Sequence, residues 1–469
     1  MSAESPPAER AGLLALIREA LAGSNQDFTE GSLTRAIALL AIPMVLEMSM
    51  ESLFGIVDAF FVARLGRDAL ATVVLTESLL TVLFGIAIGL SMSTTAVVAR
   101  RYGEKDFDGA ARAGIQAIWI GVAVSALTAV IGVLFAKPVL GLMGASGDIV
   151  THGSIFTSII LGTSAVIFLL FLLNAVFRGA GDAAIAFRSL ALANAINIVL
   201  EPCLIFGLGP FPELGLAGAA IATSIGRGTG VAYQLWHLFS GRGRLHVRRT
   251  QMAADWPVMR NLLRISLHGI LQLQIATASW LGLVRIVSTF GSAALAGYGL
   301  ALRTVVMALL PAWGMSNAAA TLVGQNLGAG KPDRAERAVW LTGFYNMCFL
   351  GAVGATFLIG ADRIMALFEP EPQVIPRYRL SAHFELWILI LRVGNGVGAV
   401  KFNGAGDTAT PTRVNFSCYW MLQIPAAYCL AIVIAETRGV FWAVPHSRVR
   451  DGAGQLLALP PGRLKTKQV

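Results

Sequence analysis

FRGAGD, at Phe177–Asp182, and FNGAGD, at Phe402–Asp407, are one motif that occurs twice in this sequence of 469 residues. The offset in numbering between the two copies is 402 − 177 = 225. The same offset relates further residues without a gap: Gly66 and Gly291, Gly89 and Gly314, Gly103 and Gly328, and Arg112 and Arg337. Unrelated stretches do not share one offset over so long a range by chance, so the chain is a tandem duplication.

The composition places both halves in a membrane. The chain is 55% hydrophobic and 13% charged, whereas soluble domains carry about 25% charged residues. Apolar stretches of about 20 residues or more recur, and each can cross a ~30 Å hydrocarbon core as a helix. Such continuous runs are not those of a β-barrel, whose strands alternate. We expect eleven spanning helices, at residues 36–62, 70–98, 113–136, 153–177, 185–208, 215–239, 262–290, 293–323, 338–360, 380–402 and 411–435.

The duplication and the spans together predict an all-α, polytopic membrane protein built from two tandem six-helix bundles. Because each half has an even number of spans, both halves enter the membrane with the same orientation, and a pseudo-twofold axis runs along the membrane normal. The expected segments are a cytoplasmic N-terminal arm (1–34), an N-terminal lobe (35–239), a cytoplasmic interlobe linker (240–261), a C-terminal lobe (262–445) and an atypical basic tail (446–469).

The tail interrupts the twelfth helix. Gly439–Pro445 begins like an apolar span, but His446, Arg448, Arg450 and Asp451 follow it. About seven apolar residues cannot cross ~30 Å, and each central Arg or Asp costs roughly 2.5 to 3.5 kcal/mol on insertion scales. The twelfth helix is therefore expected to be defective, and our hypothesis is that the residues from about His446 onward derive from a shifted reading frame.

The formal charge of +9 is explained by membrane topology. Basic residues gather in the segments that an N-terminus-inside arrangement places in the cytoplasm, as the positive-inside rule requires. We therefore expect a multi-pass protein of the inner membrane, with the lipid bilayer and not nucleic acid as its partner. The short apolar stretch Leu13–Leu21 is interrupted by Arg18 and Glu19 and is no signal peptide. It lies along the inner membrane surface or belongs to a solvated arm.

Enzymatic and cofactor motifs are missing from the sequence. It has no HExxH, no GxSxG with partners and no phosphate-binding GxxxxGK, so neither an enzyme nor an ATP-driven pump is expected. The cysteines show no CxxC spacing, which argues against a disulfide framework or a zinc site: Cys203, Cys348, Cys418 and Cys429. No cofactor is expected, and no oligomeric state follows from the sequence.

Polar residues inside the apolar spans are the candidate functional residues, because charge in lipid is costly. Asp58 and Glu201 both lie toward the outer ends of outward-running spans, with Asn197 one helical turn from Glu201 and Thr223 at a similar depth in the sixth span. Carboxylates among amide and hydroxyl groups can be neutralised by a proton or by a small hard cation. The alternatives are an interfacial Asp58 paired with Arg64 or Arg67, and a helix-end Glu201 beside Pro202.

Stretches from several parts of the chain give it a family resemblance: VDAFFVARLG (Val57–Gly66), the RGAGD and NGAGD pair, NIVLEP (Asn197–Pro202) and GAAIAT (Gly218–Thr223). In this order, together with the repeat, they resemble the multidrug and toxic compound extrusion family over Leu33–Trp442. The resemblance implies a two-lobed, twelve-helix exporter that moves drug-like, often cationic, molecules out of the cell in exchange for entering H⁺ or Na⁺.

The resemblance also implies roles for individual residues. In the family, a first-helix Asp, a fifth-helix acid with an Asn one turn earlier and a sixth-helix Thr form the coupling site, which here are Asp58, Glu201, Asn197 and Thr223. Glu201 stands where the acid is often Asp, and Phe171 stands where some relatives have an amide. Because of these two differences, the coupling ion is left open as H⁺ or Na⁺. No metal is expected other than Na⁺ at this site. Arg392 occupies a position where another branch has Asp, so the chain resembles the branch coupled through the N-terminal lobe (DinF-like) more than the NorM-like branch.

Candidate substrate contacts lie in the first span and in the second half of the chain. Glu47 and Glu51, one turn apart, contact a cationic substrate or pair with Arg303 or Arg392, and Met48 lines an adaptable cavity or packs. Arg303 and Arg392, with Arg285, also keep open an alternative function in a related superfamily, that of a lipid-linked oligosaccharide flippase, because the diphosphate headgroup is anionic.

Overall fold

The computed structural model describes residues 12–366 and 399–434, and all regular structure within these ranges is helical. This confirms the predicted all-α fold. The first half contains α1 (Leu13–Ala22), α2 (Leu33–Val62), α3 (Arg67–Gly103), α4 (Phe107–Leu142), α5 (Gly147–Gly162), α6 (Ser164–Ala180), α7 (Ala183–Phe206) and α8 (Leu216–Ser240). The second half contains α9 (Trp256–Ser288), α10 (Ser292–Gly328), α11 (Pro332–Ala366), α13 (Ala409–Asn415), the π-helical segment η3 (Phe416–Gln423) and α14 (Ile424–Ile434).

Long apolar helices dominate the described part of the chain. Seven segments are long and apolar enough to cross a membrane, as expected of a multi-pass membrane protein: Leu33–Leu65, Arg67–Gly103, Phe107–Leu142, Ile149–Ala180, Ala183–Phe206, Trp256–Ser288 and Pro332–Thr356. The predicted span 153–177 is divided between α5 and α6 at Thr163, whose hydroxyl bonds the carbonyl of Ile159 at 2.7 Å. Most of the predicted span 380–402 and the whole tail 446–469 lie outside the described residues, so the defective twelfth helix stays a prediction.

Glycines that are related by the repeat offset make reciprocal contacts between the two halves. A Cβ on Gly103 would lie 2.0 Å from the carbonyl oxygen of Gln325, and a Cβ on Gly328 would lie 2.1 Å from that of Arg100. Because 100 + 225 = 325 and 103 + 225 = 328, a twofold rotation exchanges these two contacts. These contacts confirm the predicted pseudo-twofold relation between the halves.

A second pair of glycines, nearer the middle of the helices, repeats the relation. A Cβ on Gly89 of α3 would lie 2.6 Å from the backbone nitrogen of Ile270 on α9. A Cβ on Gly314 of α10 would lie 2.7 Å from the backbone nitrogen of Val45 on α2. Here 45 + 225 = 270. Glycine is required at all these positions because two helix backbones approach without room for a side chain.

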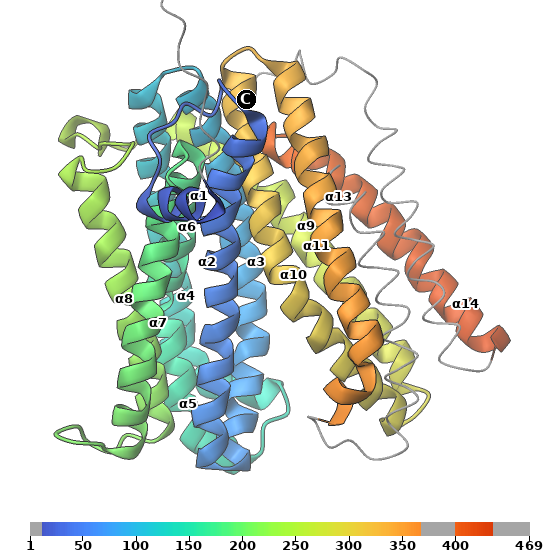
Figure 1. Cartoon of the computed structure of the whole chain (residues 1–469). Helices are drawn as coiled ribbons and strands as arrows, with labels where there is room; N and C mark the ends of the chain where they lie inside the picture. The colour runs from blue at the N-terminus through green and yellow to red at the C-terminus, as the bar shows by residue number, and fades with distance from the viewer. Residues whose placement is uncertain (1–11, 367–398, 435–469) are drawn as a thin grey trace, which may run out of the picture.

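The helices form two groups, α2–α8 and α9–α14, joined by the segment 241–255 (Figure 1). The helices of the second group run obliquely to those of the first, approach them near α1 and diverge toward the opposite face (Figure 1). The segment 241–255 lies within the predicted linker 240–261, and the bounds of the two lobes stay a prediction.

The N-terminal residues 19–31, called the arm below, lie at the face where the two groups meet, which is called the arm face. Basic side chains from both halves donate to carbonyl oxygens of the arm. The donors of the first half are Arg188 to Leu21 (3.0 Å) and Arg244 to Gln26 (2.8 Å), and those of the second half are Lys331 to Thr29 (3.0 Å) and Arg334 to Gly31 (2.9 Å). The arm therefore bridges the two halves.

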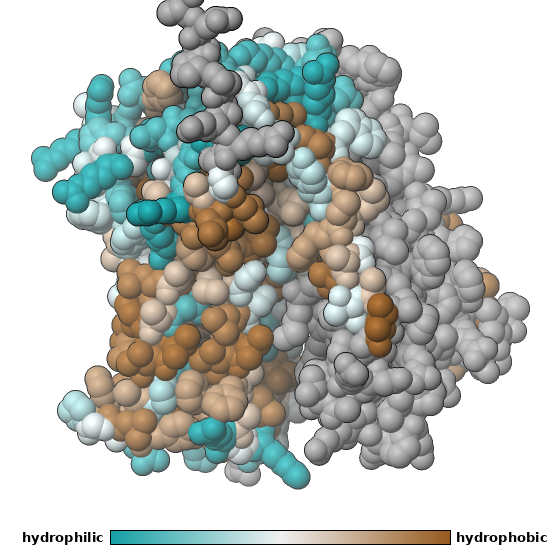
Figure 2. Space-filling view, in the orientation of Figure 1, coloured by the Kyte–Doolittle hydropathy of each residue, from teal (hydrophilic) through white to brown (hydrophobic). Residues whose placement is uncertain are grey.

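Phe28 anchors the centre of the arm. Its side chain is 2% exposed and shares a buried cluster with Leu322 of α10 and Ala338 of α11, while the guanidinium of Arg244 lies 4.7 Å from its ring. For Leu13–Leu21 the sequence left open a membrane-surface helix or a solvated arm, and both stay open because Leu13 and Leu14 of α1 are exposed. The residues that follow, up to Gly31, pack against the protein. Hydrophilic residues also gather at the arm face, above a band of apolar ones (Figure 2).

Candidate ion-coupling site

The structure brings together all four residues predicted for the coupling site. Asp58 lies four residues before the end of α2, Asn197 and Glu201 share one face of α7, and Thr223 lies on α8. The amide of Asn197 lies 3.5 Å from the hydroxyl of Thr223, and the carboxyl of Asp58 contacts both that hydroxyl and the carboxyl of Glu201. The site therefore joins three helices of the first half.

Glu201, like Asn197, is completely enclosed in this site. It is fully buried, and no N–H or O–H donor of a described residue reaches either of its carboxylate oxygens. The side-chain oxygen of the buried Asn197 likewise has no donor among these residues. Buried acceptors are normally satisfied, and two carboxylates in contact repel each other. A proton or a small cation between the acids satisfies both requirements.

The helix around Glu201 is shaped by its neighbour Pro202. Proline has no N–H, so the carbonyl of Ile198 lacks its intrahelical donor at the level of the acid. The alternative pairing of Asp58 with Arg64 is not what the structure shows, because the guanidinium of Arg64 lies over the ring of Phe60, 4.4 Å from its centroid.

Glu47 and Glu51 have arginine partners that the sequence analysis did not predict. Arg178 of α6 donates to Glu47 at 2.7 Å, and Arg227 of α8 donates to Glu51 at 2.7 Å. The sequence analysis left open a contact with a cationic substrate or a pairing with Arg303 or Arg392. Arg392 and the side chain of Arg303 lie outside what the structure describes, and both observed partners belong to the first half.

The two ion pairs differ in their surroundings. Glu47 is 1% exposed as a side chain and also accepts from the amide of Asn174 at 2.9 Å, and Asn174 in turn accepts from Gln234. Glu51 is 21% exposed. Met48 is half-buried on α2, and the hydroxyl of Ser52 donates to its carbonyl at 3.4 Å. Glu47 thus belongs to an enclosed network, whereas Glu51 is partly exposed.

Arg178 and Arg227 are the functional candidates that sequence reasoning missed. The signal was present, because both are charged residues inside apolar stretches, at 164–180 and 216–240. Arg178 directly follows the predicted span 153–177, where a basic residue is expected at the cytoplasmic end, but its side chain is 6% exposed. Because Arg178 lies in the repeated motif, the sequence analysis used it as evidence for the duplication and did not consider it as the partner of a buried acid.

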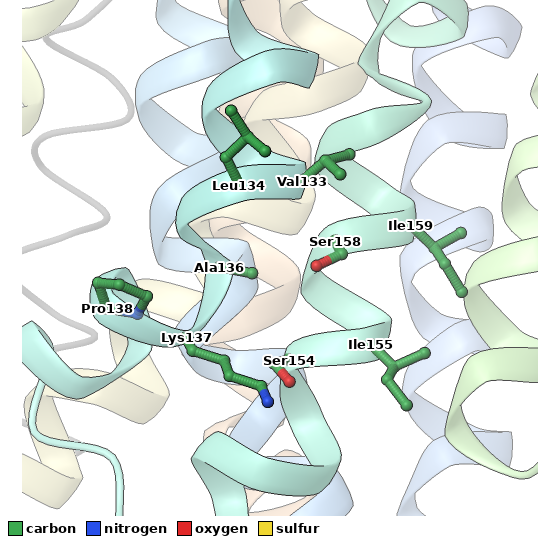
Figure 3. A pocket seen from close by; sticks show the side chains of 9 residues that line it. All are labelled: Val133, Leu134, Ala136, Lys137, Pro138, Ser154, Ile155, Ser158 and Ile159. Carbon is green, nitrogen blue, oxygen red and sulfur yellow. The ribbon is translucent and has the colours of Figure 1, made fainter.

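A separate pocket of about 410 Å³ lies between α4 and α5 and contains none of these residues (Figure 3). It is bordered by the end of α4 near Pro138 and by one side of α5, and of its nine lining residues only Lys137 is charged. A mostly apolar pocket with a single cation does not resemble the acidic site, so the candidate site remains the cluster around Asp58.

Fold and site together define a two-lobed, multi-pass helical membrane protein with two acids in contact in its first half, one of them fully buried. The chain belongs to the MatE family, whose sequence profile matches residues 43–203 and 271–429, once in each half. This confirms the resemblance seen in the sequence.

Individual relatives cover most of the chain. The probable multidrug resistance protein NorM of Thermotoga maritima is 26% identical over 400 residues, covering 83% of this chain and 84% of its own length. YoeA of Bacillus subtilis, a probable multidrug resistance protein, is 25% identical over 414 residues (87% and 89%), and an FAD transporter of Shewanella oneidensis is 25% identical over 436 residues (88% and 94%).

Solved structures share the fold. The crystal structure of MATE in the straight conformation superposes with a TM-score of 0.83 at 23% identity, covering 92% of this chain and 96% of that one. An outward-facing conformation of a multidrug resistance MATE family transporter of the MOP superfamily gives a TM-score of 0.84 at 22% identity, with the same coverage.

Proposed function

We propose that this protein exports small organic cations in exchange for protons by alternating access between its two lobes. The observation that carries the proposal is the contact between Asp58 and the fully buried Glu201, whose carboxylate oxygens no donor of a described residue reaches. The relatives named as multidrug resistance proteins support export as the direction and organic compounds as the cargo.

A proton is the coupling ion that this geometry favours. Two carboxyl groups in direct contact are held together by one shared proton, whereas a Na⁺ ion takes several oxygen ligands and separates them. Moving one charge through the membrane potential releases about 2.3 kcal/mol per 100 mV. This lies within the typical range of a coupling free energy, about 1 to 3 kcal/mol, so one site of this kind is sufficient.

The arm face is the cytoplasmic face in this proposal. The basic side chains that hold the arm all lie there, as the positive-inside rule requires of a cytoplasmic side: Lys105, Arg188, Arg244, Lys331 and Arg334. The acid pair then lies toward the outer face of the inner membrane, from which the proton enters.

The alternative function of an oligosaccharide flippase receives no support from the described residues. It was based on Arg285, Arg303 and Arg392. Arg285 is exposed on α9, and the side chains of the other two lie outside the described part of the chain.

Transport by proteoliposomes tests the proposal. With a lipophilic cation such as tetraphenylphosphonium inside, an imposed inward proton gradient should drive its efflux, and Asp58→Asn or Glu201→Gln should abolish this efflux. Asp68→Asn, on an exposed carboxyl in the first turn of α3, is the matched control and should transport at the parental rate. Efflux driven by a Na⁺ gradient alone, or parental rates in both acid variants, would contradict the proposal.

A further inference from the structure

Arg227 lies between two acids of α2. Glu51, Phe54 and Asp58 are spaced three and four residues apart and so share one face of that helix. The terminal nitrogen Nη2 of Arg227 donates to Glu51 at 2.7 Å, and the guanidinium carbon lies over the ring of Phe54, 4.5 Å from its centroid. The guanidinium thus rests on the residue between the acids.

One of the two terminal nitrogens of this guanidinium makes no hydrogen bond to a described residue. Its Nη1 is buried and has no hydrogen-bond partner among the described residues, although buried donors are normally satisfied. Thr223, which contacts Asp58, lies one turn before Arg227 on the same face of α8. The positive charge of Arg227 also acts on Asp58. The unused donor is therefore close to the coupling site.

The distance between the acids suits a single arginine side chain. Glu51 and Asp58 are seven positions apart, which is about 10 Å along a helix axis at 1.5 Å per residue. The guanidinium over Phe54 already contacts Glu51, and Asp58 lies four residues beyond Phe54, so a movement of about 6 Å along the axis brings it to Asp58. The cation–π contact with Phe54 is compatible with both positions, because the ring lies between them.

We propose that Arg227 is a tethered counter-ion that moves between Glu51 and Asp58, and that Glu51 binds the organic cation when Arg227 has left it. This rests on the proposed function and names the residue that links its two ligands. With a proton shared by Asp58 and Glu201, Arg227 pairs with Glu51, which is the arrangement in the structure. When the proton leaves, the acid pair gains a negative charge and attracts the guanidinium.

Charge balance makes cargo and proton exclusive. The charged groups around the switch are Glu51 and Asp58 on α2, Glu201 on α7, Arg227 on α8 and, facing Asp58 from α3, Glu77. Glu47 lies one turn from Glu51, but its charge is balanced by Arg178. Loss of the proton leaves one more negative charge among them, and a cationic cargo at Glu51 replaces it. Re-entry of the proton returns Arg227 to Glu51, where it displaces the cargo. This is the order of events that an antiporter requires.

Glu51 is the acid that suits this role, and Glu47 is not. The side chain of Glu51 is 21% exposed and has one arginine partner, whereas Glu47 is 1% exposed and is held by both Arg178 and Asn174. An organic cation has access to the first and would have to break a buried network to reach the second.

Binding of tetraphenylphosphonium to the purified full chain in nanodiscs tests the switch. In the parent protein, binding at pH 6 should be at least about fivefold weaker than at pH 8.5, the lower end of a typical coupling. Arg227→Gln should bind tightly at both pH values, so that this ratio falls close to one. Arg227→Lys, which keeps the charge, should retain most of the ratio, and Glu51→Gln should lose binding at both pH values.

Arg64→Gln removes an arginine outside the site and is the matched control, with a parental ratio expected. The thermal unfolding of each variant shows whether it is folded, and a rescue by Arg227→Lys is not expected from a merely structural arginine. A parent without any pH dependence of binding refutes the proposed function itself. A parental ratio in Arg227→Gln, with a pH-dependent parent, refutes only the switch.

Discussion

Gly103→Ala is the substitution that most directly perturbs the closed arm face. The added Cβ would lie 2.0 Å from the carbonyl oxygen of Gln325, and the next nearest atoms, at 2.7 and 2.8 Å, are also backbone. Ordinary contact begins near 3.4 Å, so the two backbones of α3 and α10 must move apart by the difference between 3.4 Å and 2.0 Å. No rotation of a side chain relieves this contact. Gln325 is itself held, because its amide donates to the carbonyl of Gly179 at 2.9 Å.

The substitution destabilises only the conformation in which α3 and α10 are in contact at the arm face. Overpacking of this kind destabilises a packed state by about 1 to 3 kcal/mol. In a carrier that alternates, the conformation in which α3 and α10 have parted at the arm face has no such clash. The equilibrium should therefore shift toward it by about 5- to 150-fold.

Distance measurements between spin labels can detect this shift. Labels at Arg101 and Arg337, both exposed at the arm face, in a cysteine-free background should report one short distance in the parent protein and an added longer one in Gly103→Ala. Gly351→Ala, on a helical glycine with open space around it, is the control. A distance distribution in Gly103→Ala that matches both the parent and Gly351→Ala would refute the reasoning.

Three further predictions concern the buried contacts of the first half and the arm. Arg178→Ala leaves Glu47 buried without its cation and should destabilise the protein by about 3 to 5 kcal/mol, measured by denaturation in micelles, unless Glu47→Gln is added. Phe28→Ala removes the buried anchor of the arm and should cost about 3 to 5 kcal/mol in the same assay, whereas an alanine at an exposed leucine of α1 should cost little. Partial burial opposes ionisation of Asp27, but hydrogen bonds from Lys105 and Thr29 lower its pKa from 3.8 to about 2. This contact therefore stabilises the attached arm fully above about pH 4 and is lost as the pH falls through about 2, and Asp27→Asn should increase protease cleavage of the arm at neutral pH.

The repeat and the hydrophobic periodicity of the sequence predicted the spanning helices, the equivalence of the two halves and the depth of each polar residue along its helix. The constant offset between the two halves predicted which residues are equivalent, and the contacts of Gly103 and Gly328 follow that rule. The four coupling residues were found because each is a polar group in an apolar span, at a depth that counting along the helix gives. The roles of these residues stay a proposal.

Contacts between helices could not be predicted in this way. Glu47 and Arg178 are 131 residues apart, and nothing in their spacing identifies them as partners. The attachment of the arm has no sequence signature either, because lysines and arginines there bind backbone carbonyls, which every residue carries. Likewise, the π-helical segment Phe416–Gln423 lies in a stretch that periodicity interprets as an ordinary helix.

The arm also has a consequence for biosynthesis. Thr29 is made early, but Lys331, which donates to its carbonyl, follows 302 residues later. At about 5 to 20 residues per second, the ribosome needs roughly 15 to 60 seconds to supply it. During that time the arm can bind only the first lobe, and the site for Phe28 lacks the wall that α10 and α11 provide. The two lobes are therefore joined at this face late, after most of the chain has been translated.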